Sequence, residues 1–241
     1  MMLGARTAAW AKSGSPTPPA YGGLCFTAKT ANSSVQLTAV GSAPAVTLVK
    51  SFDGVNWEDY AVGEVIELPS IGKYVYLAAG EGGNETFGSS TSNYHQFVIN
   101  GLVSASGDIT SLRNFDLAQT TLASFCYYSM FQGCTGLTSA PELPATTLAS
   151  FCYNSMFQGC TGLTSAPELP ATTLATYCYR SMFQGCTHLA LIKVHFTAWG
   201  SQTLSWVSNV ASTGTFYKPR VLPEQYGINK IPTGWTVMNI D

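Results

Sequence analysis

At 241 residues the chain is long enough for two modest domains, each with its own core. Only 10% of its residues are charged, the formal net charge is −2 and there is no basic run, so we expect no nucleic-acid binding driven by phosphate neutralisation. No apolar stretch approaches the roughly 18 residues that span a bilayer, so we expect no membrane insertion either.

Residues 1–20 are predicted to form an anchoring arm and a linker. Leu3, Arg6 and Trp10 are the candidate anchor, because apolar side chains and one cation suit docking on a neighbouring copy or another assembly protein. The Pro/Ser/Gly-rich residues 13–19 form the spacer. The apolar patch at residues 8–11 is shorter than the roughly 7–15 residues of a secretory signal, so we expect no signal peptide; a mature fragment with an added Met is the alternative.

Residues 21–105 show the two-residue period of β-strands. Short runs rich in Val, Leu, Tyr and Phe are separated by turn signals such as Asp53-Gly54. This pattern predicts a small antiparallel, immunoglobulin-like β-sandwich. Trp57 and Tyr60 after that turn either form a sugar-stacking platform or close one end of the core, and the second interpretation is favoured because buried aromatic residues dominate such cores.

Residues 106–191 contain three copies of a 26-residue repeat, at 114–139, 140–165 and 166–191. Neighbouring copies are identical at 20 of 26 positions. A period of this length with Leu at fixed places is typical of a leucine-rich-repeat solenoid. Leu148, Cys152 and Met156 lie four residues apart and predict one face of a short helix, so each copy is interpreted as helix, turn and strand.

Residues 192–241 depart from the repeat and are predicted to form a C-terminal cap. The ends of a repeat array need covering, and Trp199, Trp206 and Trp235 are large enough to cover the last copy. The predicted fold class is therefore mixed: a small Ig-like antiparallel β-sandwich, followed by a short helix–turn–strand leucine-rich-repeat solenoid with a C-terminal cap.

Six of the seven cysteines recur with the repeat, at 126, 134, 152, 160, 178 and 186. Eight-residue spacing does not suit a zinc site, which uses closer pairs, and six interchangeable thiols do not suit a nucleophile. Disulfides within a column of three would leave one cysteine over. We therefore expect free, buried cysteines that serve packing, with no metal, cofactor or catalytic residue assigned.

One acidic residue recurs in each copy, as Asp116, Glu142 and Glu168. Closely spaced carboxylates suit a retaining glycosidase, but the repeat itself imposes their spacing. A solvated row of acids is therefore the favoured interpretation.

Two columns differ between otherwise near-identical copies. The first holds Tyr128, Asn154 and Arg180, and the second holds Gly136, Gly162 and His188. Because packing conserves the inward positions of a repeat, we expect the variable positions to be exposed. The candidate recognition surface comprises Tyr128, Asn154, Arg180, His188, Trp57 and Tyr60, and neutral drift is the alternative explanation.

The motif Phe-Gln-Gly-Cys, present at 131–134, 157–160 and 183–186, resembles the F-x-G-C-x-x-L core of BspA-like leucine-rich repeats of gut bacteria. The resemblance extends over most of residues 45–241. It implies a surface-exposed adhesion or recognition protein without catalytic residues, and similar modules occur on phages of these hosts.

These expectations combine into a functional prediction. The protein is predicted to be a non-catalytic virion fibre or decoration protein that attaches to a host-surface glycan or protein, with a bacterial cell-surface adhesin as the alternative. Expected partners are other virion or surface-assembly proteins and further copies of the chain.

Overall fold

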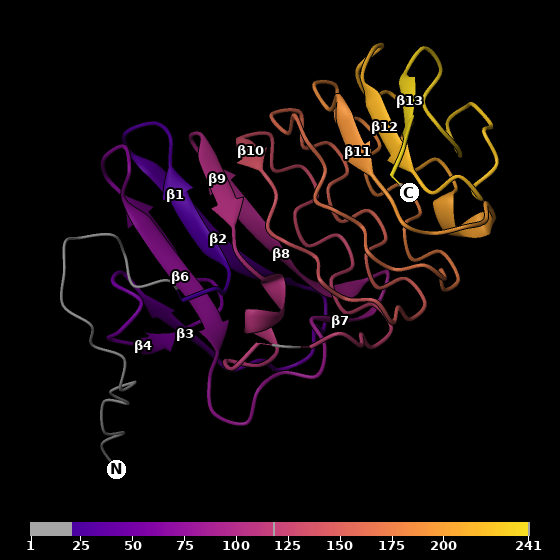
Figure 1. The fold of residues 1–241 in the computed structure, drawn as a ribbon. Helices are drawn as coiled ribbons and strands as arrows, with labels where there is room; N and C mark the ends of the chain where they lie inside the picture. The colour runs from indigo at the N-terminus through magenta and orange to yellow at the C-terminus, as the bar shows by residue number, and fades with distance from the viewer. Residues whose placement is uncertain (1–20, 118, 241) are drawn as a thin grey trace.

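The computed structural model describes residues 21–117 and 119–240, and the predicted anchor at Leu3, Arg6 and Trp10 lies outside these residues. The described chain is built from β-strands, two short 3-10 helices and many turns (Figure 1). The strands are β1 Cys25–Ala28, β2 Ser33–Val40, β3 Leu48–Ser51, β4 Glu58–Tyr60, β5 Val65–Leu68, β6 Tyr74–Ala79, β7 Gly88–Ser90, β8 Asn93–Asn100, β9 Val103–Ser106, β10 Leu137–Ser139, β11 Leu191–Lys193, β12 Thr215–Lys218 and β13 Thr236–Asn239. The 3-10 helices are Ile109–Leu112 and Ser201–Thr203.

The first part of the chain forms two sheets that share a core. One sheet has the strand order β10-β9-β1-β6-β3-β4 and the other β5-β2-β8-β7. Phe26 of β1 and Phe97 of β8 contact each other across the two sheets, with ring centroids 5.0 Å apart. In β5 the sequence alternates, so Ile66 and Leu68 are buried while Val65 and Glu67 face solvent.

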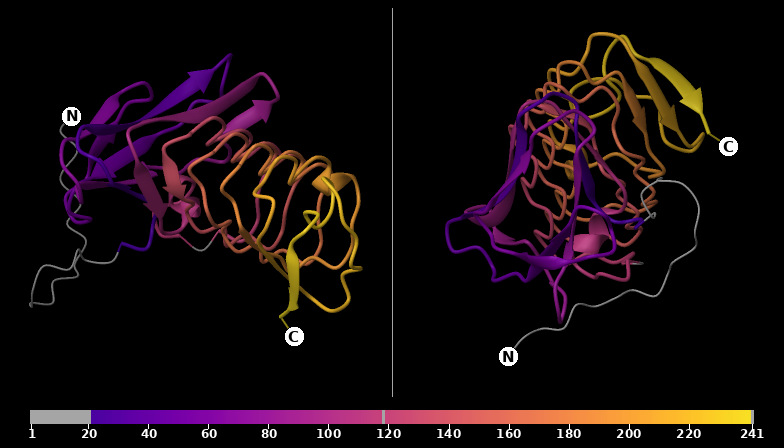
Figure 2. Two further views of the ribbon diagram at one scale, coloured as in Figure 1. Left: turned by 90° about the horizontal axis from the view of Figure 1, so that it is seen from above. Right: turned by 90° about the vertical axis from the view of Figure 1, so that its left-hand side faces the viewer.

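The repeats continue directly from these sheets. β10 of the first copy pairs in parallel with β9, although β9 itself pairs antiparallel with β1. Phe97 of β8 also donates its backbone N–H to the carbonyl of Met130, at 2.7 Å. The copies then lie side by side along the molecule (Figure 2, left).

The predicted helix–turn–strand solenoid is wrong. Over the part of the chain that the structure describes there is no α-helix, and the segment around Leu148, Cys152 and Met156 consists of consecutive turns. Cys152 donates its N–H to Ala149 within the copy, whereas Tyr153 donates to Cys178 of the next copy, and this alternation continues along the segment. An α-helix keeps its backbone bonds within itself, so sharing half of them with the next copy excludes a helix.

The four-residue period of the sequence comes from these turns. In each turn segment every fourth residue has a left-handed backbone, as at Phe151, Ser155 and Gly159, with φ of 60°, 55° and 75°. The next two residues of each four point inward, so Cys152 and Met156 are fully buried. A four-residue turn and a helix of 3.6 residues per turn therefore produce nearly the same spacing of apolar residues.

Two aromatic columns run through the interior. Phe97, Phe131, Phe157 and Phe183 stack with centroids 5.0, 5.5 and 5.8 Å apart, and Phe183 then contacts Trp206. A second column joins Phe87, Tyr127, Tyr153, Tyr179 and Phe196. Both columns begin in the sandwich and end in the C-terminal segment, so a single hydrophobic core extends from Leu24 to Trp235.

The cysteines are buried, as the sequence predicts, and all seven are free. The second cysteine of each copy also makes a polar contact. The thiols of Cys134, Cys160 and Cys186 donate to the carbonyls of Phe97, Phe131 and Phe157, at 3.1, 3.0 and 3.0 Å. These weak hydrogen bonds link the first copy to β8 and each later copy to the one before it.

The C-terminal segment continues the turn pattern where its sequence no longer matches the repeat. Ser205 and Asn209 again have positive φ, and Phe183 donates its N–H to Trp206 at 2.8 Å. β11, which precedes these turns, and β12 and β13, which follow them, form a parallel sheet. Trp206 is fully buried and Trp235 is 4% exposed, while Trp199 is only half-buried.

Candidate functional site

The turn segments present one face outward, which we call the outer face. It comprises side chains that are at least partly accessible: Ser124, Phe125, Tyr128 and Gln132 in the first copy, Ser150, Phe151 and Gln158 in the second, and Thr176, Tyr177, Arg180 and Gln184 in the third. Because each copy is hydrogen-bonded to the next, equivalent side chains form rows along the molecule.

The outer face carries an aromatic row. Phe125 stacks on Phe151 with centroids 4.8 Å apart, and Phe151 contacts Tyr177 at 5.2 Å. All three side chains are half-buried. They have positive φ values of 58°, 60° and 53°, a conformation that costs about 1–2 kcal/mol for a residue other than glycine. Every fourth residue of a turn segment has this backbone, so the strain belongs to the turns, and what distinguishes these three positions is a partly accessible aromatic side chain in each copy.

Two residues of the first variable column contact the two ends of the aromatic row. At one end Tyr128 contacts Phe125 at 5.9 Å and Tyr94 of β8 at 5.1 Å. At the other end the guanidinium of Arg180 lies 5.5 Å from the ring centroid of Tyr177. Two of the three variable residues therefore belong to the row.

Asn154, the middle residue of that column, is not exposed. It is only 4% accessible, and its side-chain oxygen accepts a hydrogen bond from the Ser155 hydroxyl at 2.9 Å. Since Asn154 lies in the middle copy, a copy on each side covers it. The expectation that the whole column is exposed is wrong at this position, while Arg180 is exposed and Tyr128 half-buried.

The second variable column is also mixed. His188 is exposed and its Nδ1 lies 2.6 Å from the carbonyl of Thr161. Gly136 is buried, and a Cβ at this position would lie only 2.0 Å from the carbonyl oxygen of Gly101. The first copy lies so close to the turn between β8 and β9 that this position requires glycine. In the third copy the same position has room for the imidazole of His188.

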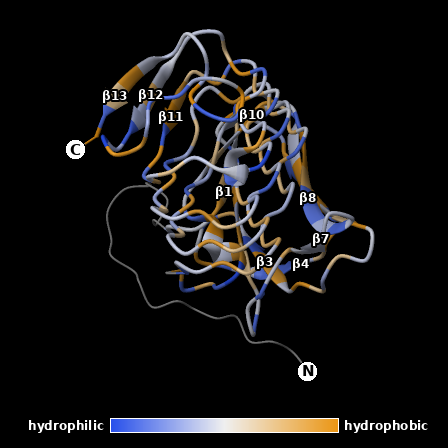
Figure 3. Ribbon diagram, turned by 90° about the vertical axis from the view of Figure 1, so that its right-hand side faces the viewer, coloured by the Kyte–Doolittle hydropathy of each residue, from blue (hydrophilic) through white to orange (hydrophobic). Residues whose placement is uncertain are grey.

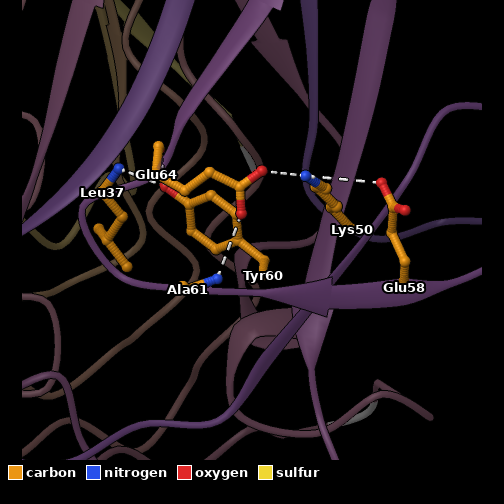
Figure 4. A network of polar contacts seen from close by, with 6 residues as sticks. All are labelled: Leu37, Lys50, Glu58, Tyr60, Ala61 and Glu64. Carbon is orange, nitrogen blue, oxygen red and sulfur yellow. Dashed lines mark hydrogen bonds and ion pairs between the residues drawn. The ribbon is translucent and has the colours of Figure 1, made fainter.

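Of the two candidate residues Trp57 and Tyr60, Tyr60 is too buried to stack on a sugar. Tyr60 is 4% exposed, and its hydroxyl accepts a hydrogen bond from Leu37 N–H at 2.8 Å and donates to the carbonyl of Glu64 at 2.9 Å (Figure 4). Trp57 packs edge-on against Tyr21 and Phe115, with centroids 4.9 and 4.8 Å away. Tyr60 therefore belongs to the sandwich core, whereas Trp57 is half-buried against neighbouring aromatic residues.

Lys50 links the carboxylates beside Tyr60. Its ammonium pairs with Glu64 and lies 3.5 Å from Glu58 (Figure 4). Burial opposes the charged form of Lys50, but the contacts with Glu64 and Glu58 outweigh it and raise the pKa of Lys50. The hydrogen bond from Lys50 lowers the pKa of Glu64. A carboxyl group held ionised in this way is not suited to act as a general acid near neutral pH.

We expect Tyr60→Phe to lower the free energy of unfolding by about 1–3 kcal/mol, because it leaves the buried N–H of Leu37 without its partner. Urea unfolding measures the change. Tyr226→Phe is the matched control, since Tyr226 is 48% exposed and its hydroxyl bonds only to Glu224 among the contacts the structure gives. Equal losses in the two variants would contradict the assigned role of the Tyr60 hydroxyl.

The remaining surface offers two shallow hollows. One of about 360 Å³ is lined by Lys50, Asp53, Asn56 and Trp57, among others. The other, of about 510 Å³, lies between residues 80–85 and 113–116. In the first hollow the Ser51 hydroxyl donates to the Asp53 carboxylate at 3.0 Å, and the same carboxylate accepts from the backbone N–H groups of Val55 and Asn56 in the turn.

The acidic column is exposed at Asp116, Glu142 and Glu168, as expected of a solvated row. Glu168 pairs with Lys193 at 2.9 Å and with His195 at 2.6 Å, and these contacts lower its pKa. Nowhere in residues 21–117 and 119–240 do three His, Cys, Asp or Glu side chains gather so as to hold a metal ion. The same residues include no helix with the length and apolar character needed to cross a bilayer.

Sequence reasoning missed the aromatic row itself. Phe125, Phe151 and Tyr177 were placed on a predicted helix, where they had no special position. The signal was the conservative change from Phe to Tyr in the third copy, which is typical of a ring whose edge reaches solvent. Comparison of this chain with protein-family models, with curated proteins and with solved structures finds no match.

Proposed function

We propose that this protein is a non-catalytic recognition protein, a phage virion fibre or decoration protein whose outer face attaches to a host surface. The observation that carries the proposal is the aromatic row, in which each copy has a partly accessible aromatic side chain. Aromatic and arginine side chains dominate the binding energy of recognition surfaces. The resemblance of the Phe-Gln-Gly-Cys motif to BspA-like repeats supports the same class of function.

A bacterial cell-surface adhesin is the second candidate, favoured by that same motif, which resembles repeats of bacterial surface proteins. In both cases residues 1–20, with Leu3, Arg6 and Trp10, act as the anchor to other assembly proteins or to further copies. Labelling with an antibody separates the two: a virion protein is detected on purified particles, and an adhesin on intact uninfected cells.

Attachment itself is tested by changing Tyr128 and Arg180 to asparagine, the residue that the middle copy carries at the same position. The double variant is expected to bind host cells at least about tenfold less well than the unchanged protein. Its melting temperature should change little, because neither side chain is fully buried. Unchanged attachment would remove the outer face as the recognition surface.

A further inference from the structure

The outer face crosses the boundary between the sandwich and the repeats. Tyr94 of β8 contacts Tyr128 of the first copy, with ring centroids 5.1 Å apart, and the side-chain amide of Gln96 donates to the backbone carbonyl of Gln132. Tyr94 and Gln96 lie in the half of β8 nearest β7, which is its hydrophilic half (Figure 3). The face is thus one continuous strip from β8 to the third copy.

A row of amides lies four residues further along each copy than Tyr128, Asn154 and Arg180. The side chain of Gln132 donates to that of Gln158 at 3.1 Å, and Gln158 donates to Gln184 at 3.3 Å. Each glutamine amide has two donor hydrogens and an acceptor oxygen with two lone pairs. One bond to each neighbour therefore leaves every amide with capacity for a further partner, and all three side chains are partly accessible.

The strip is almost without charge. Among its residues only Arg180 is ionised at neutral pH, and its assigned contact is the ring of Tyr177. A phosphate polymer or an acidic peptide would find one cation where several are needed for binding. The surface therefore suits a ligand that is neutral and offers hydroxyl groups to the amides.

The spacing of the strip suits a ligand with its own repeat. Successive rings of the row lie 4.8 and 5.2 Å apart, and the glutamines recur with the same 26-residue period. A globular protein partner would need a buried area above about 1,000 Å² with projecting anchors or pockets. Here each ring is half-covered by its neighbours, which leaves a narrow periodic strip of edges and amides instead.

We propose that the outer face binds an uncharged linear polysaccharide that lies along the row, across successive copies. The sugar units would lie along the exposed edges of Tyr94, Phe125, Phe151 and Tyr177, and their hydroxyls would bond to the amides of Gln132, Gln158 and Gln184. Aromatic side chains and a few placed amides are the usual lining of a neutral ligand site. The proposal rests on the recognition function above and names its ligand class.

The test is binding of the full chain to uncharged linear polysaccharides, a β-glucan, a mannan, a xylan and a galactan, each supplied from the disaccharide upward. At least one of them is expected to bind, with affinity rising with chain length as more rings are covered, and with little dependence on salt. The variant Phe151→Asn/Tyr177→Asn is expected to lose at least about tenfold in affinity. Asparagine tolerates positive φ, so the backbone should keep its conformation, and thermal unfolding verifies this.

Phe52→Asn is the matched control, because Phe52 is 49% exposed on the loop after β3 and outside the outer face. It should leave polysaccharide binding unchanged. No binding to any of the four polymers, or equal losses in the control and the double variant, would overturn the proposal. Binding only to an acidic polysaccharide, lost at high salt, would also overturn it.

Cell attachment separates this inference from the proposed function. If Phe151→Asn/Tyr177→Asn abolishes attachment to host cells while none of the polymers binds, the recognition function holds and the uncharged linear polysaccharide is refuted as its ligand. If a polymer binds but attachment is unaffected by the double variant, the glycan site stands and the proposed role of this face in attachment fails.

Discussion

Phe157→Ala is expected to lower the free energy of unfolding by about 3–5 kcal/mol. Phe157 is fully buried and stacks between Phe131 and Phe183, with centroids 5.5 and 5.8 Å away. The substitution removes a large apolar side chain and breaks the column in the middle copy, where a neighbour on each side prevents collapse. Because one core extends through the molecule, the loss should appear as a single shifted unfolding transition in urea.

Phe52→Ala serves as the control for this prediction. Its ring is 49% exposed, so the change in stability should stay within about 0.5 kcal/mol. A loss below about 1 kcal/mol for Phe157→Ala would contradict a continuous core, since burial of this kind of side chain contributes more than that.

Raising the pH is expected to unfold the protein cooperatively by about pH 11. Burial raises the pKa of Cys126, Cys134, Cys178 and Cys186 from 9.0 to about 12. Burial also raises the pKa of Tyr127, Tyr153 and Tyr179 well above 10.0.

The direction of the pH effect on stability follows from the number of protons bound in the folded and in the unfolded state. Between pH 9 and 12 the folded protein keeps thiol protons that the unfolded chain releases, so the stability is fully present below pH 9 and is lost as the pH rises. Each thiol removes up to about 1.4 kcal/mol per pH unit, so four of them remove about 8 kcal/mol by pH 10.5. That is comparable to the 5–15 kcal/mol stability of an ordinary domain.

Circular dichroism and the ultraviolet absorbance of thiolate measure this transition together. Both signals should change at the same pH, and at neutral pH a thiol reagent should find almost no reactive group before denaturation and all seven cysteines after it. Gradual thiolate formation near pH 9 with an intact fold would show that the cysteines are accessible. Fewer than seven thiols after denaturation would show disulfides.

The repeat and its inward residues could be predicted from the sequence because packing constrains them directly. Copies that stack must place the same side chain at the same depth, so Cys160, Leu163 and Leu169 recur without change and are all buried. The role of Tyr60 as a core residue followed in the same way, from the prevalence of aromatic residues in sandwich cores.

The outer face could be predicted only in part. Sequence variation marked Tyr128 and Arg180 correctly as surface residues, but it marked Asn154 equally, and that side chain is buried. Sequence variation shows where packing tolerates a change of side chain. A small buried amide such as that of Asn154 is tolerated there as well as an exposed side chain is. The ring contacts of Tyr94 with Tyr128 depend on two segments distant in sequence, which no local pattern brings together.

By itself the sequence determined the period, the boundaries of the copies and the residues that face the core. Only the tertiary structure decided that these copies are turns and not helices. Apolar residues four apart satisfy both conformations, and the choice depends on where the backbone N–H groups find acceptors. Here every second one, such as that of Tyr153, reaches the carbonyl of Cys178 in the next copy, 25 residues away. That partner exists only once the copies have stacked, so tertiary contact selects the local conformation and with it the strip of side chains that faces outward.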